Sequence, residues 1–187
     1  MAAKDPVLTP ELLKIIKIFG IASILLVLGL SFFNSRRANN TGDDLTFRMS
    51  DAARIYFLNM KAINYDREIR SDAGMTLFRH EDLSVGNEDL GIQLVLILNP
   101  PKDEAYLYLE PQNFDWPIQI KSGGETFTFK NGNKSDHLSA INQLKALIQG
   151  GKMISLVQNE IEIPIWKKKS EKEALKQVFE DYARLME

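Results

Sequence analysis

The sequence contains no cysteine among its 187 residues. This absence excludes disulfides, thiolate zinc sites, iron–sulfur clusters and cysteine nucleophiles. Two histidines remain, His80 and His137, and they lie far apart in the sequence. His137 falls in the first turn of a predicted helix, where we expect it to face solvent or a neighbouring carboxylate. His80 stands beside Glu81 and Asp82, but alternation along a strand directs Glu81 away from its two neighbours. We therefore predict that the protein has no metal site and no cofactor.

Motifs for phosphate binding and hydrolysis are also missing. The patterns GxSxG and HExxH do not occur, and the glycine pairs at 123–124 and 150–151 fit a hairpin turn and a helix end rather than a phosphate loop. Glu160 and Glu162 share one face of an alternating strand, where paired carboxylates serve acid–base catalysis or a charged sheet edge. We interpret them as an edge, and we predict that the protein is not an enzyme.

The charge of the chain disfavours nucleic acid as a partner. The net charge is −2, and residues 38–187 carry 18 basic and 23 acidic side chains, or about −5. Nucleic acid binding depends mainly on neutralising phosphates with cations. The densest basic segment, residues 166–173, is interpreted as a solvated strand-to-helix junction, with a patch for anionic lipid or an acidic partner as the alternative.

An apolar segment at residues 12–33 predicts a helix that spans a membrane. Its 22 residues extend over about 33 Å at the α-helical rise, enough to cross the hydrocarbon core. Lys14 and Lys17 interrupt it near its start, and their long stems allow the ammonium groups to reach the interface. Thr9 is the predicted N-cap and Pro10 the first helical residue. Residues 1–35 are thus expected to form an N-terminal tail and anchor.

A cleaved secretory signal is the alternative for this segment. Against it, the leader is long and carries Asp5 and Glu11, and bulky Phe32 and Phe33 occupy the place of a small-residue cleavage site. We predict an uncleaved signal anchor in an inner or plasma membrane. Lysine and arginine are balanced on the two sides, but the short tail and the absence of cysteine favour an extracytoplasmic head.

Small residues form a narrow stripe along the predicted anchor. Projection at 100° per residue places Gly20, Ser23, Val27 and Ser31 on one face. Small side chains permit close approach of a second helix, and serines form hydrogen bonds across such a contact. The sequence therefore indicates a helix–helix contact here, although transmembrane helices often carry glycine and serine without one.

The fold class predicted for the remainder is α+β. Residues 36–44 form a polar linker, and residues 45–187 a soluble, mainly antiparallel sheet domain with two helices near the C-terminus. Alternating patterns predict strands at 75–80, 104–110, 116–121, 126–130, 152–158 and 160–166, and a nearly continuous apolar run predicts a strand buried on both faces at 92–98. Two hairpins are expected, one from 92–98 with 104–110 and one from 116–121 with 126–130. Helical periods predict a helix after a cap at Ser135 or Asp136, and a second helix that begins with a Ser170–Glu173 capping box.

Residues 45–69 are ambiguous in this scheme. Ser50 and Asp51 are suitable helix caps, whereas the aromatic and β-branched content of 53–60 is typical of a strand. We predict strands.

A further expectation concerns Tyr106 and Tyr108, which alternate with core-facing leucines. They are expected to form an outer patch for protein contact, or to pack under the C-terminal helix.

The functional hypothesis follows from these exclusions and this architecture. We expect a non-catalytic, single-pass membrane subunit of a multi-protein complex, with a structural, accessory or assembly role in transport, secretion or respiration. Its partners are the lipid bilayer and other membrane subunits, contacted through the anchor and the head. The alternative is a membrane-anchored extracytoplasmic module that binds a small ligand, glycan or peptide.

Overall fold

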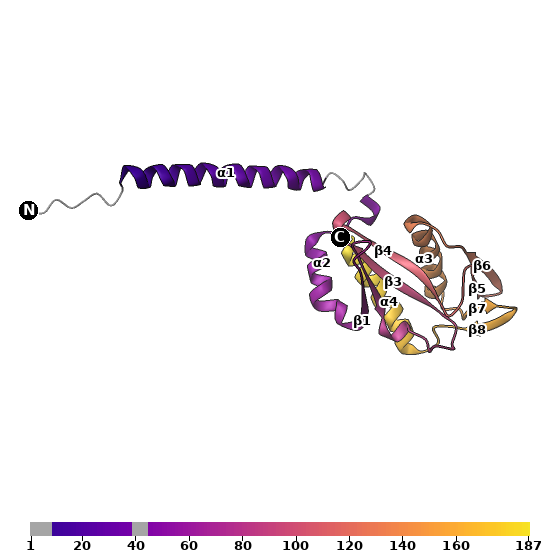
Figure 1. Ribbon diagram of the computed structural model, residues 1–187. Helices are drawn as coiled ribbons and strands as arrows, with labels where there is room; N and C mark the ends of the chain where they lie inside the picture. The colour runs from indigo at the N-terminus through magenta and orange to yellow at the C-terminus, as the bar shows by residue number, and fades with distance from the viewer. Residues whose placement is uncertain (1–8, 39–44) are drawn as a thin grey trace, which may run out of the picture. The chain divides into compact units, whose positions relative to one another are not determined.

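The computed structural model describes residues 9–38 and 45–187. The chain divides into two compact units, Met1–Asp43 and Asp44–Glu187, and each is described by itself. In the first unit, helix α1 covers Pro10–Ala38 (Figure 1). Thr9 Oγ1 accepts a hydrogen bond from the Leu12 N–H at 3.3 Å, so the predicted helix start is confirmed. The helix continues to Ala38 and includes residues that were assigned to the linker.

Helix α1 is long and apolar enough to cross a membrane. Its stretch Pro10–Leu30 has 21 residues and a mean hydropathy of 2.3, and none of that stretch is buried. A membrane anchor and an N-terminal signal sequence both meet this criterion. The structure therefore establishes a single apolar N-terminal helix within its described residues, without assigning a side of a membrane.

The second unit, called the head below, contains two antiparallel four-stranded sheets. The first sheet has the order β1-β2-β3-β4 and the second the order β6-β5-β7-β8. The strands of the first are β1 (Tyr65–Arg70), β2 (Met75–His80), β3 (Gly91–Asn99) and β4 (Glu104–Gln112). Those of the second are β5 (Ile118–Ser122), β6 (Glu125–Phe129), β7 (Ile154–Gln158) and β8 (Ile161–Pro164). The predicted α+β class and the strands of both hairpins are confirmed.

The centre of the first sheet is β3, which is buried along both of its faces. All of its residues except Ile97 are buried. Leu96 pairs with Phe78 of β2 on one side and with Leu107 of β4 on the other. An apolar run that pairs on both sides removes its side chains and its backbone from water together. The continuous apolar pattern of residues 92–98 therefore predicted this strand correctly.

Two long helices accompany the sheets, α3 (Lys134–Gln149) and α4 (Lys169–Leu185). Helix α4 contacts β3 and β4 through a buried stripe that includes Leu175 and Val178, while α3 lies beside β4 (Figure 1). The two predicted helices are thus confirmed. Their predicted caps are wrong by two or three residues, because the caps are Asn133 for α3 and Lys168 for α4.

The prediction of strands across 45–69 is wrong for most of that segment. Helix α2 covers Asp51–Tyr56, a π turn η2 covers Phe57–Lys61, and a 3-10 turn η3 covers Ala62–Asn64. Ser50 Oγ accepts from the Ala53 N–H at 3.1 Å and caps α2. Only the end of the segment is extended, as β1. The helical cap and the packing of Phe57 into the core prevail over the strand propensity of this segment.

Candidate interaction surface

The predicted small-residue stripe lies on α1. Gly20, Ser23 and Val27 are all exposed in the described structure, and no atom lies within 4 Å of a Cβ built at Gly20. The side chain of Ser31 lies outside the described residues. A helix surface of this kind allows the backbone of a second helix to approach closely. Because the described residues contain no second helix apolar enough to span a membrane, the helix–helix contact stays a prediction.

The two predicted contact tyrosines are placed differently from one another. Tyr106 is buried at 8% exposure, and its ring lies 6.0 Å edge-on from that of Phe47. Tyr108 is half-buried and its ring centroid lies 3.9 Å from that of His137 in α3. Tyr106 is covered by residues before α2, and Tyr108 by α3 rather than the C-terminal helix. These placements leave little tyrosine surface for a partner.

The neighbourhood of His137 corrects a further expectation. This histidine was expected to face solvent or a carboxylate in the first turn of a helix, yet it is 2% exposed. Its Nδ1 accepts from the Leu109 N–H at 3.3 Å, and its Nε2 lies 3.2 Å from Asn131 Oδ1. The histidine is therefore a structural link between α3 and the edge of β4. Burial lowers its pKa, and the charge of Asp136 opposes that effect.

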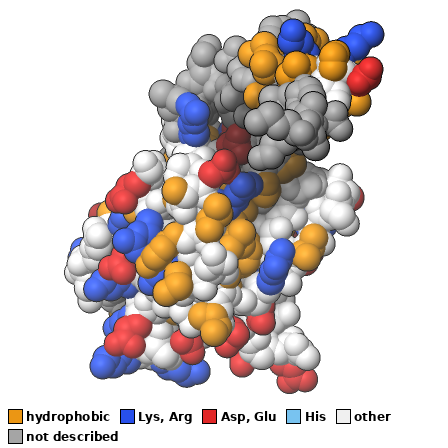
Figure 2. All heavy atoms as spheres, turned by 90° about the vertical axis from the view of Figure 1, so that its left-hand side faces the viewer, with side chains coloured by type: hydrophobic (Ala, Val, Ile, Leu, Met, Phe, Trp, Pro, Cys, Tyr) orange, Lys and Arg blue, Asp and Glu red, His pale blue; other side chains and the backbone are white. Residues whose placement is uncertain are grey.

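Besides Tyr56, four large apolar side chains are exposed on the segment α2–η2–η3, and we call these four the α2 face. They are Ile55, Leu58, Met60 and Ile63, and their exposed fractions range from 40% to 83%. Figure 2, which views the head from the side of α2, shows hydrophobic side chains gathered on this surface. Contiguous exposed apolar groups in a folded domain mark a site of protein or membrane contact.

The π turn determines which side chains face outward. Ala53, Phe57 and Ala62 pack against the core, and the interval between the last two is five residues, as the hydrogen bond from the Ala62 N–H to the Phe57 carbonyl requires. A π turn inserts one extra residue into a helix, and such turns are frequent at functional sites. Leu58 and Met60 lie on this turn and are exposed, while Phe57 is buried.

A buried polar cluster supports the α2 face from beneath. The Tyr65 hydroxyl donates to Asp181 Oδ2 of α4 at 2.8 Å, and Gln177 Nε2 lies 3.5 Å from the same oxygen. Lys61 Nζ, on the π turn, lies 3.8 Å from Asp181 Oδ1. Burial and the Asp181 carboxylate together raise the pKa of Tyr65. The cluster fixes η2 and β1 to α4, so the face above it is ordered.

The cations of this segment are engaged within the head. Arg54 Nη2 pairs with Asp51 at 2.6 Å, and the guanidinium of Arg184 lies 4.4 Å from the ring centre of Tyr56. Lys61 points to a buried carboxylate, as described above. The α2 face therefore offers apolar surface for burial rather than free positive charge.

The face adjoins the free edge of the first sheet. Strand β1 follows η3 directly, and its outer edge is unpaired in the described part of the chain. Its exposed side chains include Asp66, Arg67, Glu68 and Arg70. Charged side chains on an edge strand oppose strand addition by another chain. The edge of β1 is therefore protected against strand addition, whereas the α2 face beside it presents apolar side chains.

The residues that the structure describes contain no group of three histidine, aspartate or glutamate side chains suited to a metal ion. His80, singled out in the sequence, is 5% exposed, with its Nε2 3.4 Å from Gln177 Oε1. It belongs to the polar cluster beneath the α2 face. The α2 face was not predicted from the sequence, because residues 45–69 were interpreted as strands.

Comparison with known proteins shows no significant similarity: no family model, no curated protein and no solved structure matches this chain.

Proposed function

We propose that this chain is a non-catalytic, single-pass membrane subunit whose head binds another protein of the same assembly through the α2 face. The observation that carries the proposal is the exposure of Ile55, Leu58, Met60 and Ile63 on an ordered segment. Leaving four large apolar groups in water forgoes burial that stabilises proteins by about 25 cal/mol per Å². A partner that covers them recovers this free energy.

The chemistry of the face favours an apolar protein surface over a lipid surface. Interfacial helices that bind bilayers combine an apolar face with free lysine and arginine for anionic headgroups. On this segment Arg54 and Lys61 have carboxylate partners within the head. The proposed occupant is therefore a largely uncharged, apolar patch on another subunit, with aliphatic or aromatic side chains that interdigitate with those of the face.

Helix α1 supports the membrane part of the proposal. Its stretch Pro10–Leu30 is apolar and unburied, so its surface requires lipid or other helices around it. Gly20 and Ser23 offer the close approach that helix pairs in membranes use. We propose an extracytoplasmic head, because a chain without cysteine suits an oxidising exterior.

Site-specific photocrosslinking in the native membrane tests the partner contact. A photoreactive residue at Leu58 or Ile63 is expected to give one discrete crosslinked species, whereas the same residue at Ile161, also exposed at 64%, gives none. The triple variant L58S/M60S/I63S is expected to lose copurification of that species. The matched control M153S/I161S, which changes exposed apolar residues elsewhere on the head, is expected to keep it.

Two results contradict the proposal. Equal crosslinking from Ile161 and from Leu58 shows that the α2 face is not a specific site. Recovery of the chain from an aqueous extract, with its amino terminus beyond Asn34, shows that α1 is a cleaved signal rather than an anchor. Protease digestion of intact cells assigns the head to its side, and protection of the head overturns the extracytoplasmic assignment.

A further inference from the structure

A groove is lined by the α3–β7 connection, the β8–α4 connection and the first turns of α4. These segments are distant in sequence from the α2 face. Its volume is about 550 Å³, within the range of small-molecule pockets. The floor is formed by Ile154, Ile165, Trp166 and Leu175, all buried at 9% exposure or less. Met153 also lines the groove and is 72% exposed. The groove therefore has a recessed apolar floor beside a projecting apolar side chain.

The charged side chains of this groove have a single sign. Lys152, Lys167 and Lys172 line it, and no aspartate or glutamate does. In the described part of the chain none of these three lysines forms an ion pair with a carboxylate. Neighbouring lysines in the same region do form such pairs: Lys168 with Glu171, Lys169 with Glu173, and Lys176 with Glu180. The three unpaired cations are thus concentrated around one apolar cavity.

We propose that this groove binds a single-chain anionic amphiphile, with the apolar chain along the floor and the negative head between the three lysines. Apolar burial supplies the attraction for the chain, and three cations without a carboxylate among them supply charge complementarity for the head. The ligand class is a fatty acid or an alkyl anion of similar shape. The site is independent of the partner contact at the α2 face.

The shape of the groove favours a single amphiphile over the surface of a bilayer. A bilayer presents a broad surface, and it contacts projecting side chains such as Met153 more readily than a floor at 9% exposure or less. A single chain enters a recess and covers Ile154, Ile165 and Leu175. The adjoining groove, of about 470 Å³, shares Trp166 and Lys167 but is also lined by acidic residues, which oppose an anion: Glu88, Asp89 and Glu171.

Trp166 provides a reporter within the groove. The protein has two tryptophans, so Trp116→Phe leaves Trp166 as the only one. Residues 44–187 serve for the measurement, because the described hydrophobic core lies wholly within that unit. Below its micelle concentration, dodecanoate is expected to change Trp166 emission saturably. Dodecanol, which has the chain without the charge, and acetate, which has the charge without the chain, are expected to bind far more weakly.

Two charge-matched triple variants assign the site. K152Q/K167Q/K172Q is expected to weaken dodecanoate binding by at least about tenfold, because each exposed cation contributes a modest attraction. K121Q/K169Q/K176Q removes the same charge from lysines that pair with carboxylates, and it is expected to change affinity by less than about twofold. Thermal unfolding of the first variant is expected to match that of the parent, since its three lysines are exposed.

Several outcomes overturn this inference. If the two triple variants weaken dodecanoate binding equally, binding depends on the net charge of the head and not on the three lysines of the groove. If dodecanol binds as tightly as dodecanoate, the negative charge of the ligand does not contribute, and the lysines have no role in binding. Binding of anionic phosphatidylglycerol vesicles without binding of monomeric dodecanoate replaces the groove with bilayer docking. An unchanged Trp166 emission together with no binding heat in calorimetry excludes the site altogether.

Discussion

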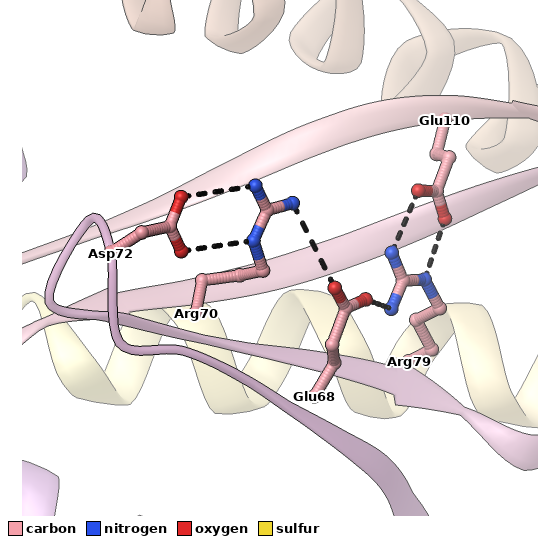
Figure 3. Close-up of polar contacts among 5 residues, drawn as sticks. All are labelled: Glu68, Arg70, Asp72, Arg79 and Glu110. Carbon is pink, nitrogen blue, oxygen red and sulfur yellow. Dashed lines mark hydrogen bonds and ion pairs between the residues drawn. The ribbon is translucent and has the colours of Figure 1, made fainter.

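Arg79 of β2 holds Glu110 of β4 through two parallel hydrogen bonds, Nε to Oε2 at 2.7 Å and Nη2 to Oε1 at 2.8 Å. Its remaining nitrogen, Nη1, donates to Glu68 of β1 at 2.7 Å (Figure 3). Phe78 and His80, the neighbours of Arg79 in β2, are buried toward the opposite side of the sheet. One guanidinium therefore joins three strands across the face away from α4.

Arg79→Lys is expected to destabilise the head by about 1 kcal/mol, since it keeps the charge but loses the two-pronged contact with Glu110. The hydrogen bonds that Arg79 donates to Glu110 raise the pKa of Arg79, because they favour its charged form. Arg70→Lys is the matched control, because Arg70 is exposed and its loss is expected to leave stability unchanged. Urea unfolding followed by far-UV circular dichroism measures both, and an equal loss in the two variants contradicts the role assigned to Arg79.

The Tyr65–Asp181 hydrogen bond gives a second prediction. Tyr65→Phe removes the donor at 2.8 Å from a buried carboxylate, and it is expected to cost about 1–3 kcal/mol of unfolding free energy. In the double variant with Asp181→Asn the combined loss is expected to be smaller than the sum of the single losses, because the two side chains act on each other. A double-mutant cycle in urea measures the difference. Additive losses show that the hydrogen bond does not stabilise the head.

Strand patterns could be predicted from the sequence because local alternation and turn residues agree with the observed packing. Both predicted hairpins occur, and the second turns at Gly123, whose φ is 61°. A side chain at that φ is strained, so a glycine at the turn is also a conformational requirement. Residues 92–98 form a nearly continuous apolar run, and such a run predicts a strand that is buried on both faces.

The helical segment before β1 could not be predicted in the same way. Ile55, Tyr56 and Phe57 have strand propensity, and only the capping bond at Ser50 and the packing of Phe57 show that they are helical. A π turn also breaks the 3.6-residue period by which helices are recognised. The α2 face was hidden for this reason. The available clue was the sequence Ser50–Asp51, which was considered as a cap and set aside.

The cap of α3 is made by local hydrogen bonds, whereas the burial of His137 depends on a tertiary contact. Asn133 precedes the predicted caps of α3 and holds the N–H groups of Ser135 and Asp136. His137 falls in an exposed-looking first turn, yet α3 places it against the edge of β4. Its burial follows from where α3 packs, and no local pattern encodes that position.

Phe57 and Leu58 provide a third prediction from adjacent positions. Phe57 is 2% exposed, and its ring lies 5.0 Å from Phe78 and 5.5 Å from Tyr65, both edge-on. Phe57→Ala is expected to cost about 3–5 kcal/mol, since it leaves a cavity in the core. Leu58→Ala changes an outward side chain and is expected to cost about 0.5 kcal/mol or less. Similar losses from the two variants, measured by urea unfolding, contradict the orientation of the π turn.

The fourth prediction concerns pH and the buried His137. Burial lowers its folded-state pKa below the ordinary value of 6.5, so the unfolded chain binds the proton at a higher pH than the folded chain does. The contribution of His137 to stability is therefore present above pH 6.5 and is lost as the pH falls through the folded pKa. Protonation of Nδ1 also removes the acceptor for the Leu109 N–H.

Urea unfolding between about pH 8 and pH 5 is expected to show this loss in the parent protein. His137→Gln carries no titrating group at the position and is expected to lower the part of the pH slope that lies below 6.5. The charge of Asp136 raises the pKa of His137 against the effect of burial, so the companion variant Asp136→Asn is expected to lower that pKa further. A proton NMR titration follows the imidazole of His137 directly. A folded-state midpoint above 6.5, or a pH slope unchanged in His137→Gln, contradicts the role of burial.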